Sequence, residues 1–294
     1  MISARCEAGF KEEVLRLQIR RCFGAVLLLL FALIGARGQT AGAPSAPAAA
    51  QSPAAPATAT QAAPATPAQT TDNVAQLQTT LLNLQKRLQD WPNLARYHDA
   101  DEQVPPPGPD ENRVVFMGDS ITDNWGSKYG KFFPGEPYIN RGISGQTTPQ
   151  MLIRFWPDVV ALGPKVVVIL AGTNDIAGNT GPTTMEAIED NLMAMTELAR
   201  ANGIRVVLAT LLPVSDAIQP QTTRRPPEKI VELNQWIKDY ATENGIVLLD
   251  YYSALIDDQK MFRKELTFDG LHPNDAGYAV MAPLAEKAIA EALQ

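Results

Sequence analysis

The chain has 294 residues, 45% hydrophobic and 19% charged, which is enough apolar material for one or two folded domains. It carries 25 basic and 32 acidic residues, a formal net charge of -7, which argues against a protein that binds nucleic acid by neutralising phosphates. The only histidines are His98 and His272, so a mechanism that needs three or more imidazoles is excluded.

The N-terminal end has the pattern of an export signal. Arg16, Arg20 and Arg21 precede an uninterrupted apolar run over residues 22–36, which ends in small side chains of the kind that a signal peptidase reads. We therefore expect residues 1–38 to be a signal peptide that exports the chain to the periplasm, the cell surface or the medium. A retained membrane anchor is the alternative, and in either case this segment would be the only part to contact a membrane.

A low-complexity stretch follows the apolar run. Residues 41–70 consist only of Ala, Pro, Thr, Gln, Ser and Gly, with no charged and no aromatic side chain. Such a stretch has nothing large to bury, and its prolines break helices. Residues 39–71 are therefore predicted to be a disordered linker, which either holds the next domain away from a surface or is a spacer without a specific role.

Residues 72–109 are predicted to form an amphipathic helix and a connector. Apolar side chains at alternating steps of three and four define one stripe of the helix: Val74, Leu77, Leu81, Leu84, Leu88 and Trp91. Pro92 ends this helix, and His98, in the connector, is expected to be a solvated surface residue. We expect the stripe to pack on the following domain. Dimerisation through it is the alternative, so the chain is predicted to be a monomer or a weak dimer.

From residue 110 onward, short β-branched runs alternate with helical patterns. The predicted strands cover residues 113–117, 138–140, 165–171, 204–211 and 245–250. The predicted helices cover residues 148–162, 183–202, 227–244 and 274–293. Because the strands are almost continuously apolar, they require a sheet that is covered on both faces. Residues 110–294 are thus predicted to be an α/β domain with a doubly wound parallel sheet, in which chemistry is found in the loops after the strands.

These loops contain residues suited to nucleophilic catalysis. The blocks are GDSIT from Gly118, GISGQTT from Gly142, GTND from Gly172 and DGLHPN from Asp269. A serine becomes a nucleophile when a base removes its proton, and the base works best when a carboxylate fixes its tautomer. His272 and Asp269 meet this requirement for Ser120. The N–H groups of Ser120 and Gly145 and the side-chain amide of Asn174 are candidate donors to the oxyanion of a tetrahedral intermediate.

The four blocks resemble those of the SGNH or GDSL hydrolases, in the order in which that family has them. The resemblance covers residues 110–294 and implies that Ser120 is the nucleophile of a triad with Asp269 and His272. It also implies that Ser120, Gly145 and Asn174 form the oxyanion hole. The fold expected from it is a three-layer α/β/α sandwich with a flavodoxin-like parallel sheet of about five strands. No cofactor and no metal are expected.

Other candidates fit the sequence less well. Ser144 is a rival nucleophile, but the resemblance gives it no such role. Asp119 and Asp175 are expected to support their loops rather than to act in catalysis. One histidine in the domain is too few for a two-metal phosphoesterase, and neither a G-x-S-x-G elbow nor a P-loop sequence is present.

We therefore predict an exported serine esterase that hydrolyses carboxylic esters through an acyl-enzyme. The first two blocks are most similar to the acetylhydrolase-like branch, so acetyl esters on carbohydrate are the expected substrates. A lysophospholipase or lipase-type acylhydrolase is the alternative, with Trp125, Phe132 and Phe133 lining an acyl site, although the default interpretation places these rings in the core. The alternative of another class is a non-catalytic surface module that binds glycan.

Overall fold

The computed structural model describes residues 76–82, 84–85 and 88–294. All of these belong to one structural unit, Ala65–Gln294. The predicted signal peptide and linker lie outside the described residues. In the part of the chain that is described, no helix is both long and apolar enough to cross a membrane.

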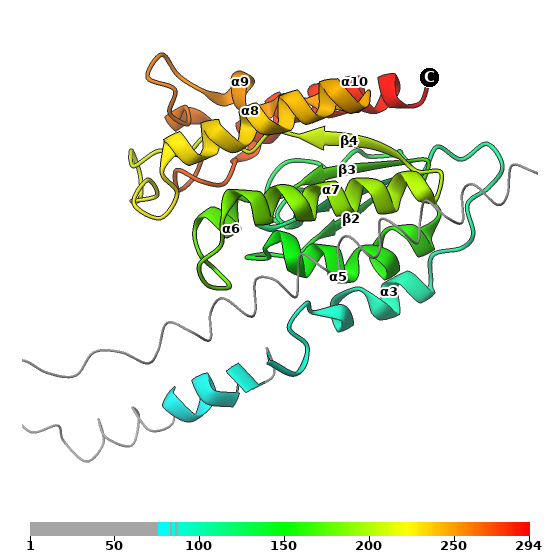
Figure 1. Ribbon diagram of the computed structural model, residues 1–294, viewed down its shortest axis with the longest axis horizontal. Helices are drawn as coiled ribbons and strands as arrows, with labels where there is room; N and C mark the ends of the chain where they lie inside the picture. Colours follow the sequence, from blue (N-terminus) through cyan, green and yellow to red (C-terminus); the bar gives the residue numbers. More distant parts are fainter. Residues whose placement is uncertain (1–75, 83, 86–87) are drawn as a thin grey trace, which may run out of the picture. The chain divides into compact units, whose positions relative to one another are not determined.

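Five parallel strands form the sheet, in the order β2-β1-β3-β4-β5 (Figure 1). Their bounds are β1 (Val114–Gly118), β2 (Tyr138–Gly142), β3 (Val166–Leu170), β4 (Arg205–Ala209) and β5 (Val247–Leu249). This order is that of flavodoxin-like sheets, in which ligands bind at the carboxyl ends of the strands near the point where the order reverses. The register places Gly118 beside both Gly142 and Leu170, so three strand ends meet at this point.

Helices cover both faces of the sheet, and together they complete the three-layer sandwich that the sequence predicts. The α-helices are α3 (His98–Glu102), α4 (Ser120–Asp123), α5 (Thr148–Asp158), α6 (Thr173–Ile176), α7 (Met185–Ala201), α8 (Pro227–Asn244), α9 (Tyr251–Leu255) and α10 (Asp275–Ala292). The 3-10 helices are η1 (Leu94–Arg96), η2 (Val160–Leu162) and η3 (Lys264–Leu266).

Side chains of β1 alternate between two separate cores, as the two-residue period of a strand requires. Val115 and Met117 are buried in the core formed with α5, α7 and α8, whereas Val114 and Phe116 are buried in the core formed with α9 and α10. Every residue of β1 and β3 is buried, which explains why these strands read as continuous apolar runs.

An aromatic cluster next to β1 includes Trp125, Phe132 and Phe133, which the sequence placed either in the core or at an acyl site. Trp125 and Phe133 are buried, and the rings of Trp125, Phe132 and Phe133 lie 6.1, 5.1 and 5.2 Å from the ring of Phe116. The default interpretation, that these rings pack in the core, is therefore confirmed.

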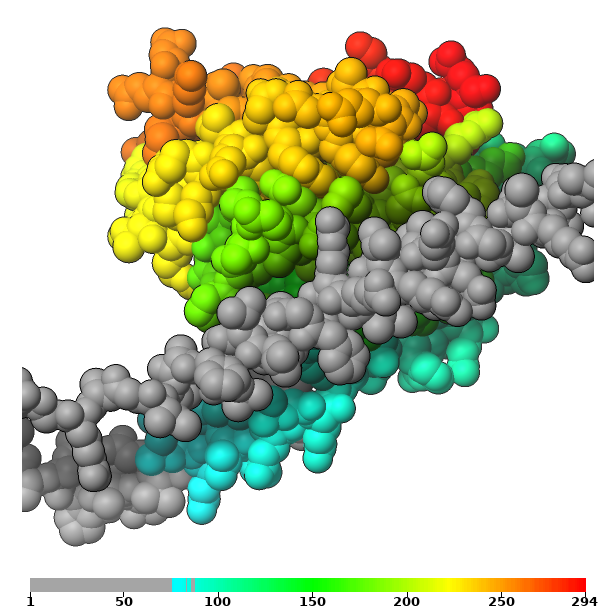
Figure 2. All heavy atoms as spheres, in the orientation of Figure 1, coloured from blue at the N-terminus to red at the C-terminus, as the bar shows by residue number. Residues whose placement is uncertain are grey.

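The N-terminal helix forms as predicted, but its apolar stripe does not pack as predicted. Residues 76–82, 84–85 and 88–89 are helical. The stripe is exposed: Leu77 by 69%, Leu81 by 57%, Leu84 by 50% and Leu88 by 79%. Figure 2 shows the cyan side chains of this segment at the surface. The prediction of packing on the domain is wrong for these residues, because both faces of the sheet are already covered and a stripe alone does not specify its partner.

Candidate active site

Ser120 stands at the turn between β1 and α4. Asp119 is the N-cap of this short helix, and its carboxylate accepts a hydrogen bond of 2.9 Å from the Ile121 N–H. At Gly118, a Cβ atom would lie only 2.0 Å from the Thr122 hydroxyl, so the glycine lets the chain turn directly from the strand into the helix. The turn places Ser120 at the carboxyl edge of the sheet.

The structure joins the three predicted triad side chains in one line of hydrogen bonds. The Ser120 Oγ lies 2.8 Å from His272 Nε2, and His272 Nδ1 lies 2.7 Å from Asp269 Oδ2. When Nδ1–H donates to the Asp269 carboxylate, the Nε2 lone pair is left to accept the Ser120 hydroxyl hydrogen. This arrangement is the one that a serine nucleophile and its base require.

Most of the support for His272 comes from its own loop. The Asp269 carboxylate also accepts from the backbone N–H groups of Leu271 at 2.9 Å and His272 at 2.8 Å. Burial by itself raises the pKa of Asp269, but the hydrogen bonds from the imidazole and the two N–H groups outweigh it and hold the pKa below its ordinary value. Asp269 therefore remains an ionised acceptor for the imidazole.

Gly270 lets this loop approach the rest of the domain. Its φ is +89°, and a Cβ atom there would lie 2.1 Å from the carbonyl oxygen of Ser215. The Ser215 N–H in turn donates to the Gly270 carbonyl at 2.8 Å. The Asp-x-x-His sequence thus has a glycine at the position where backbone packs directly on backbone.

The three predicted oxyanion donors come from three different loops. In the described part of the chain, the backbone N–H groups of Ser120 and Gly145 have no hydrogen-bond partner, so both remain available. The Asn174 side-chain nitrogen differs, because it donates to Asp119 Oδ2 at 3.2 Å and to the Gln146 carbonyl at 3.0 Å. If Asn174 donates to the oxyanion, its side-chain nitrogen must share or give up one of these bonds, and the longer bond to Asp119 is the weaker of the two.

Two arginines in the loop between β4 and α8, Arg224 and Arg225, support the residues that carry the proposed oxyanion donors. Arg225 is buried, and its guanidinium donates to the Asn174 side-chain oxygen at 3.1 Å. Arg224 donates to the Asn179 side-chain oxygen at 2.9 Å, and the Asn179 nitrogen donates to the Gly145 carbonyl at 3.0 Å. Sequence reasoning missed both arginines; the only signal was that they follow a parallel strand.

Two buried carboxylates tie these loops together without touching the reacting atoms. Burial raises the pKa of Asp119 to about 6, although the Ile121 hydrogen bond and the nearby His272 and Arg225 charges oppose the rise. Asp175, whose pKa burial also raises to about 6, accepts hydrogen bonds from the Thr148 N–H at 3.0 Å and from its hydroxyl at 2.6 Å. Their expected role in supporting the loops is confirmed.

The rival nucleophile has no base beside it. The Ser144 hydroxyl donates to Asp123 Oδ2 at 2.5 Å on the exposed side of its loop. An acceptor of this kind holds the hydroxyl but is not arranged as an imidazole base with its own orienting carboxylate.

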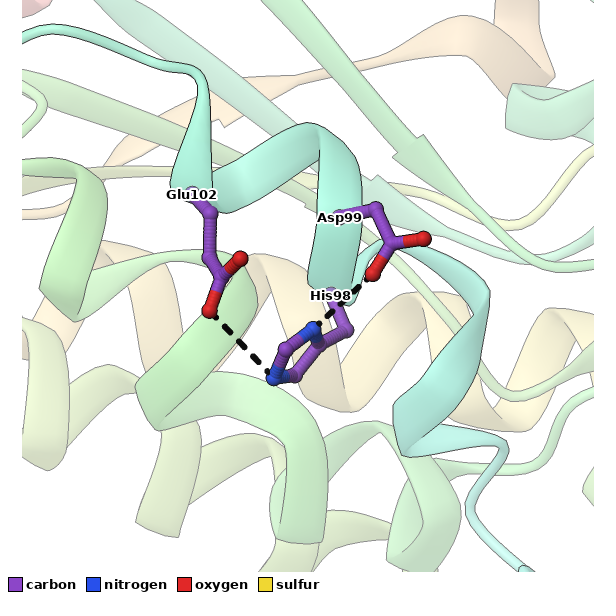
Figure 3. A group of neighbouring side chains, drawn as sticks. All are labelled: His98, Asp99 and Glu102. Atoms are coloured by element: carbon purple, nitrogen blue, oxygen red, sulfur yellow. Dashed lines mark hydrogen bonds and ion pairs between the residues drawn. The ribbon is translucent and has the colours of Figure 1, made fainter.

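A second group of acidic and imidazole side chains lies on the exposed helix α3. His98 Nδ1 is 3.2 Å from Asp99 Oδ1, and its Nε2 is 3.7 Å from Glu102 Oε1 (Figure 3). The side-chain hydrogen bond to Asp99 and the charge of Glu102 raise the pKa of His98. All three residues are exposed, as expected for His98, and none of them belongs to the site around Ser120.

Comparison with known proteins identifies the family. Residues 116–280 match the model of the GDSL-like lipase/acylhydrolase family. The chain belongs to this family. The four sequence blocks that suggested it, the five-stranded parallel sheet and the hydrogen-bonded serine, histidine and aspartate all lie in the same part of the molecule. The family resemblance and the fold predicted from the sequence are thereby confirmed.

Individual relatives agree with the family match. The chain is 26% identical over 239 residues to an acetylxylan esterase from Xylanibacter ruminicola, a match that covers 66% of this chain and 48% of that protein. The chain therefore spans about half the length of this curated relative.

Two solved structures from Bacteroides are also similar. One is assigned as an acylhydrolase, from Bacteroides fragilis, with 44% identity, a TM-score of 0.66 and coverage of 69% of this chain and 99% of that one. The other is a GDSL-like lipase from Bacteroides thetaiotaomicron, with 42% identity, a TM-score of 0.64 and coverage of 68% and 98%.

Proposed function

We propose that the protein is a serine esterase in which Ser120, His272 and Asp269 act as the catalytic triad. The observation that carries this proposal is the continuous line of hydrogen bonds from the Ser120 hydroxyl through His272 to Asp269 at the carboxyl edge of the sheet. Membership of the GDSL-like lipase/acylhydrolase family supports it.

In the first step, His272 Nε2 takes the proton from Ser120 Oγ as Oγ bonds to the ester carbonyl carbon. The carbonyl oxygen becomes negatively charged and accepts hydrogen bonds from the Ser120 and Gly145 N–H groups and from the Asn174 amide. The tetrahedral intermediate then expels the alcohol, which receives the proton from His272. An ester between the acyl group and Ser120 remains.

In the second step, water replaces the alcohol. His272 Nε2 takes a proton from the water as its oxygen bonds to the acyl carbon, and the new intermediate collapses with return of the proton to Ser120 Oγ. The products are a carboxylic acid and the free enzyme. Asp269 keeps the imidazole in the required tautomer during both steps.

We propose acetyl esters of carbohydrate as the substrates. Support comes from the acetylxylan esterase among the relatives and from the aromatic rings: Trp125 and Phe133 are buried in the core, and Phe132 packs against it, so they do not line a long acyl channel. A lysophospholipase would need such a channel. A non-catalytic glycan-binding module would have no need of an aligned serine, imidazole and carboxylate.

The proposal includes export by residues 1–38, with residues 39–71 as a linker, on the sequence argument alone. The partners are then a small-molecule or glycan ester but no nucleic acid, and the membrane is contacted only through the N-terminal segment. The exposed leucine stripe is compatible with a monomer or a weak dimer.

The test is hydrolysis of p-nitrophenyl esters from acetyl to palmitoyl, together with acetate release from acetylated xylan. Activity should be highest with acetyl and be lost in Ser120→Ala, because this variant lacks the hydroxyl that forms the proposed acyl-enzyme. Ser144→Ala tests the rival nucleophile and should keep activity on p-nitrophenyl acetate. Highest activity with long chains would favour a lipase, and an active Ser120→Ala protein would disprove the triad.

Labelling with a fluorophosphonate probe tests the chemistry without a choice of ester. The probe reacts with an activated serine, so it should label the wild-type protein and the Ser144→Ala variant but not Ser120→Ala. Absence of labelling in the wild-type protein would support the glycan-binding module.

A further inference from the structure

A groove of about 680 Å³ lies between the segment before the family domain and the loops that carry the oxyanion donors. Leu88 and Trp91 line it on one side, and Ile143, Gly145, Asn179 and Thr180 line it on the other. Gly145 supplies one of the N–H groups proposed to bind the oxyanion. The groove therefore reaches the loop that carries one of the proposed oxyanion donors.

The Trp91 side of the groove is fixed to α5 and to the loop before it. The side-chain amide of Gln150 donates to the Trp91 carbonyl at 2.6 Å, and that of Gln146 donates to the Pro92 carbonyl at 2.6 Å. The buried Arg154 holds Gln146 in turn, by donating to its side-chain oxygen at 2.5 Å. Trp91 thus has a backbone held by hydrogen bonds, although it lies outside the residues that match the family model.

A second attachment follows a few residues later. The Tyr97 hydroxyl donates to the carbonyl of Gly142, the last residue of β2. The guanidinium of Arg141 lies over the Tyr97 ring, 4.6 Å from its centre, and donates to Asp101 at 2.8 Å. The segment from Trp91 to Asp101 is therefore anchored on the strand and loop that lead to Gly145.

The groove offers a sugar ring both apolar and polar contacts. An acetyl group has a single carbon beyond the carbonyl, so it is too small to fill a groove of this volume. The groove's apolar residues are Leu84, Leu88, Trp91 and Ile143, and its polar residues that are not buried are Asp90, Asn93, Ser144, Asn179 and Thr180. A sugar ring has an apolar C–H face and a rim of hydroxyls, which matches one aromatic ring among amides and hydroxyls.

We propose that this groove binds the carbohydrate part of the ester, with Trp91 as the platform on which a sugar ring stacks. This inference rests on the proposed function, since it extends the same site beyond the reacting atoms. Trp91 is 39% exposed, so its ring is accessible to a ligand while its backbone is held. The segment before the family domain would then determine which esters are hydrolysed.

The test compares Trp91→Ala with Trp156→Ala in the full chain. Trp156 lies on α5, is 55% exposed and does not line the groove, so it is a matched control. Trp91→Ala should lower kcat/KM for acetylated xylo-oligosaccharides about ten-fold relative to kcat/KM for p-nitrophenyl acetate, mainly through KM, because the small ester has no sugar to stack. Trp91→Phe should restore part of the loss, and Trp156→Ala should leave both values unchanged.

Binding measured without turnover separates this proposal from the proposed function. In Ser120→Ala protein, calorimetric titration with xylo-oligosaccharides should show binding that Trp91→Ala weakens and Trp156→Ala does not. If the wild-type protein hydrolysed no ester but the same binding were seen, the esterase would be overturned and the groove would be kept. Equal losses on both esters, a selective loss on p-nitrophenyl palmitate, or unchanged sugar binding in Trp91→Ala would each overturn the carbohydrate groove.

Discussion

The two sides of the site around Ser120 are held in different ways. On the acid–base side, Asp269 and His272 are three residues apart, and the Asp269 carboxylate bonds both the imidazole and the backbone of its own loop. On the donor side, Gly145 and Asn174 lie in separate segments, which the Asn174 amide links by donating to the carbonyl of Gln146, the residue after Gly145. One side is built locally, and the other depends on contacts between distant parts of the chain.

This difference predicts where substitutions act. A change far from the site in sequence should leave the imidazole and its carboxylate in place but disturb the direction of the donors. Such changes would reach Asn174 through its three hydrogen-bond partners: the side chains of Asp119 and Arg225 and the backbone carbonyl of Gln146. The largest losses should come from the acid–base side, because proton transfer is needed in every step of the proposed mechanism.

Asp269→Asn should have the largest effect and is the direct test of the local side. Without the carboxylate, Nδ1 no longer has its acceptor and the imidazole takes the wrong tautomer, so kcat should fall about 10⁴-fold. The measurement is kcat for p-nitrophenyl acetate, with the exposed Asp258→Asn as the control. A fall of less than about ten-fold would mean that Asp269 does not orient the base.

Asn174→Ala tests the donor side. Removal of one oxyanion donor should lower kcat about 10²- to 10³-fold with little change in KM, because the bond forms mainly in the transition state. Asn202→Ala, at the end of α7, removes an exposed amide and is the matched control. A rise in KM with kcat unchanged would assign Asn174 to ground-state binding instead.

The sequence predicts the local features of the molecule well. All five strands were expected within a few residues of their observed bounds, and the fully buried strands β1 and β3 have the continuous apolar runs that parallel sheets require. Ser120, Asp269 and His272 were expected together because each lies in a loop at the carboxyl end of the sheet or beside the last helix. The structure brings these three side chains together as predicted.

Features that depend on long-range packing were not predictable in the same way. Arg225 lies in a loop after β4 with no recognisable motif, and only the fold shows that it reaches Asn174. The periodicity of the N-terminal helix gave its secondary structure, but not the exposure of Leu77 or Leu88, since a stripe does not identify what covers it.

Asp119 offers a test of the donor side that does not depend on catalysis. Its folded pKa of about 6 lies above the ordinary 3.8, so the stability it contributes is complete below about pH 4 and is lost as the pH rises through 6. At about 1.36 kcal/mol per pKa unit, the free energy of unfolding should fall by about 2 kcal/mol between pH 4 and pH 8 because of this group.

Asp119→Asn should remove that part of the pH dependence. Urea unfolding at pH 4, 6 and 8 gives the free energy of unfolding of the wild-type and the Asp119→Asn protein. In the difference between the two values, the contributions of the other titrating groups cancel. If the difference does not change with pH, Asp119 does not titrate in this range.

Arg225→Met should have the smallest effect on turnover and gives the sharpest test of the donor side. The guanidinium holds the Asn174 side-chain oxygen, so its loss should misdirect the amide and lower kcat about ten-fold, with Arg200→Met as the exposed control. If Arg225 acts through Asn174, Arg225→Met should cost almost nothing further in the Asn174→Ala protein. An undiminished loss there would mean that Arg225 acts on another part of the site, and the donor side would not be a single connected unit.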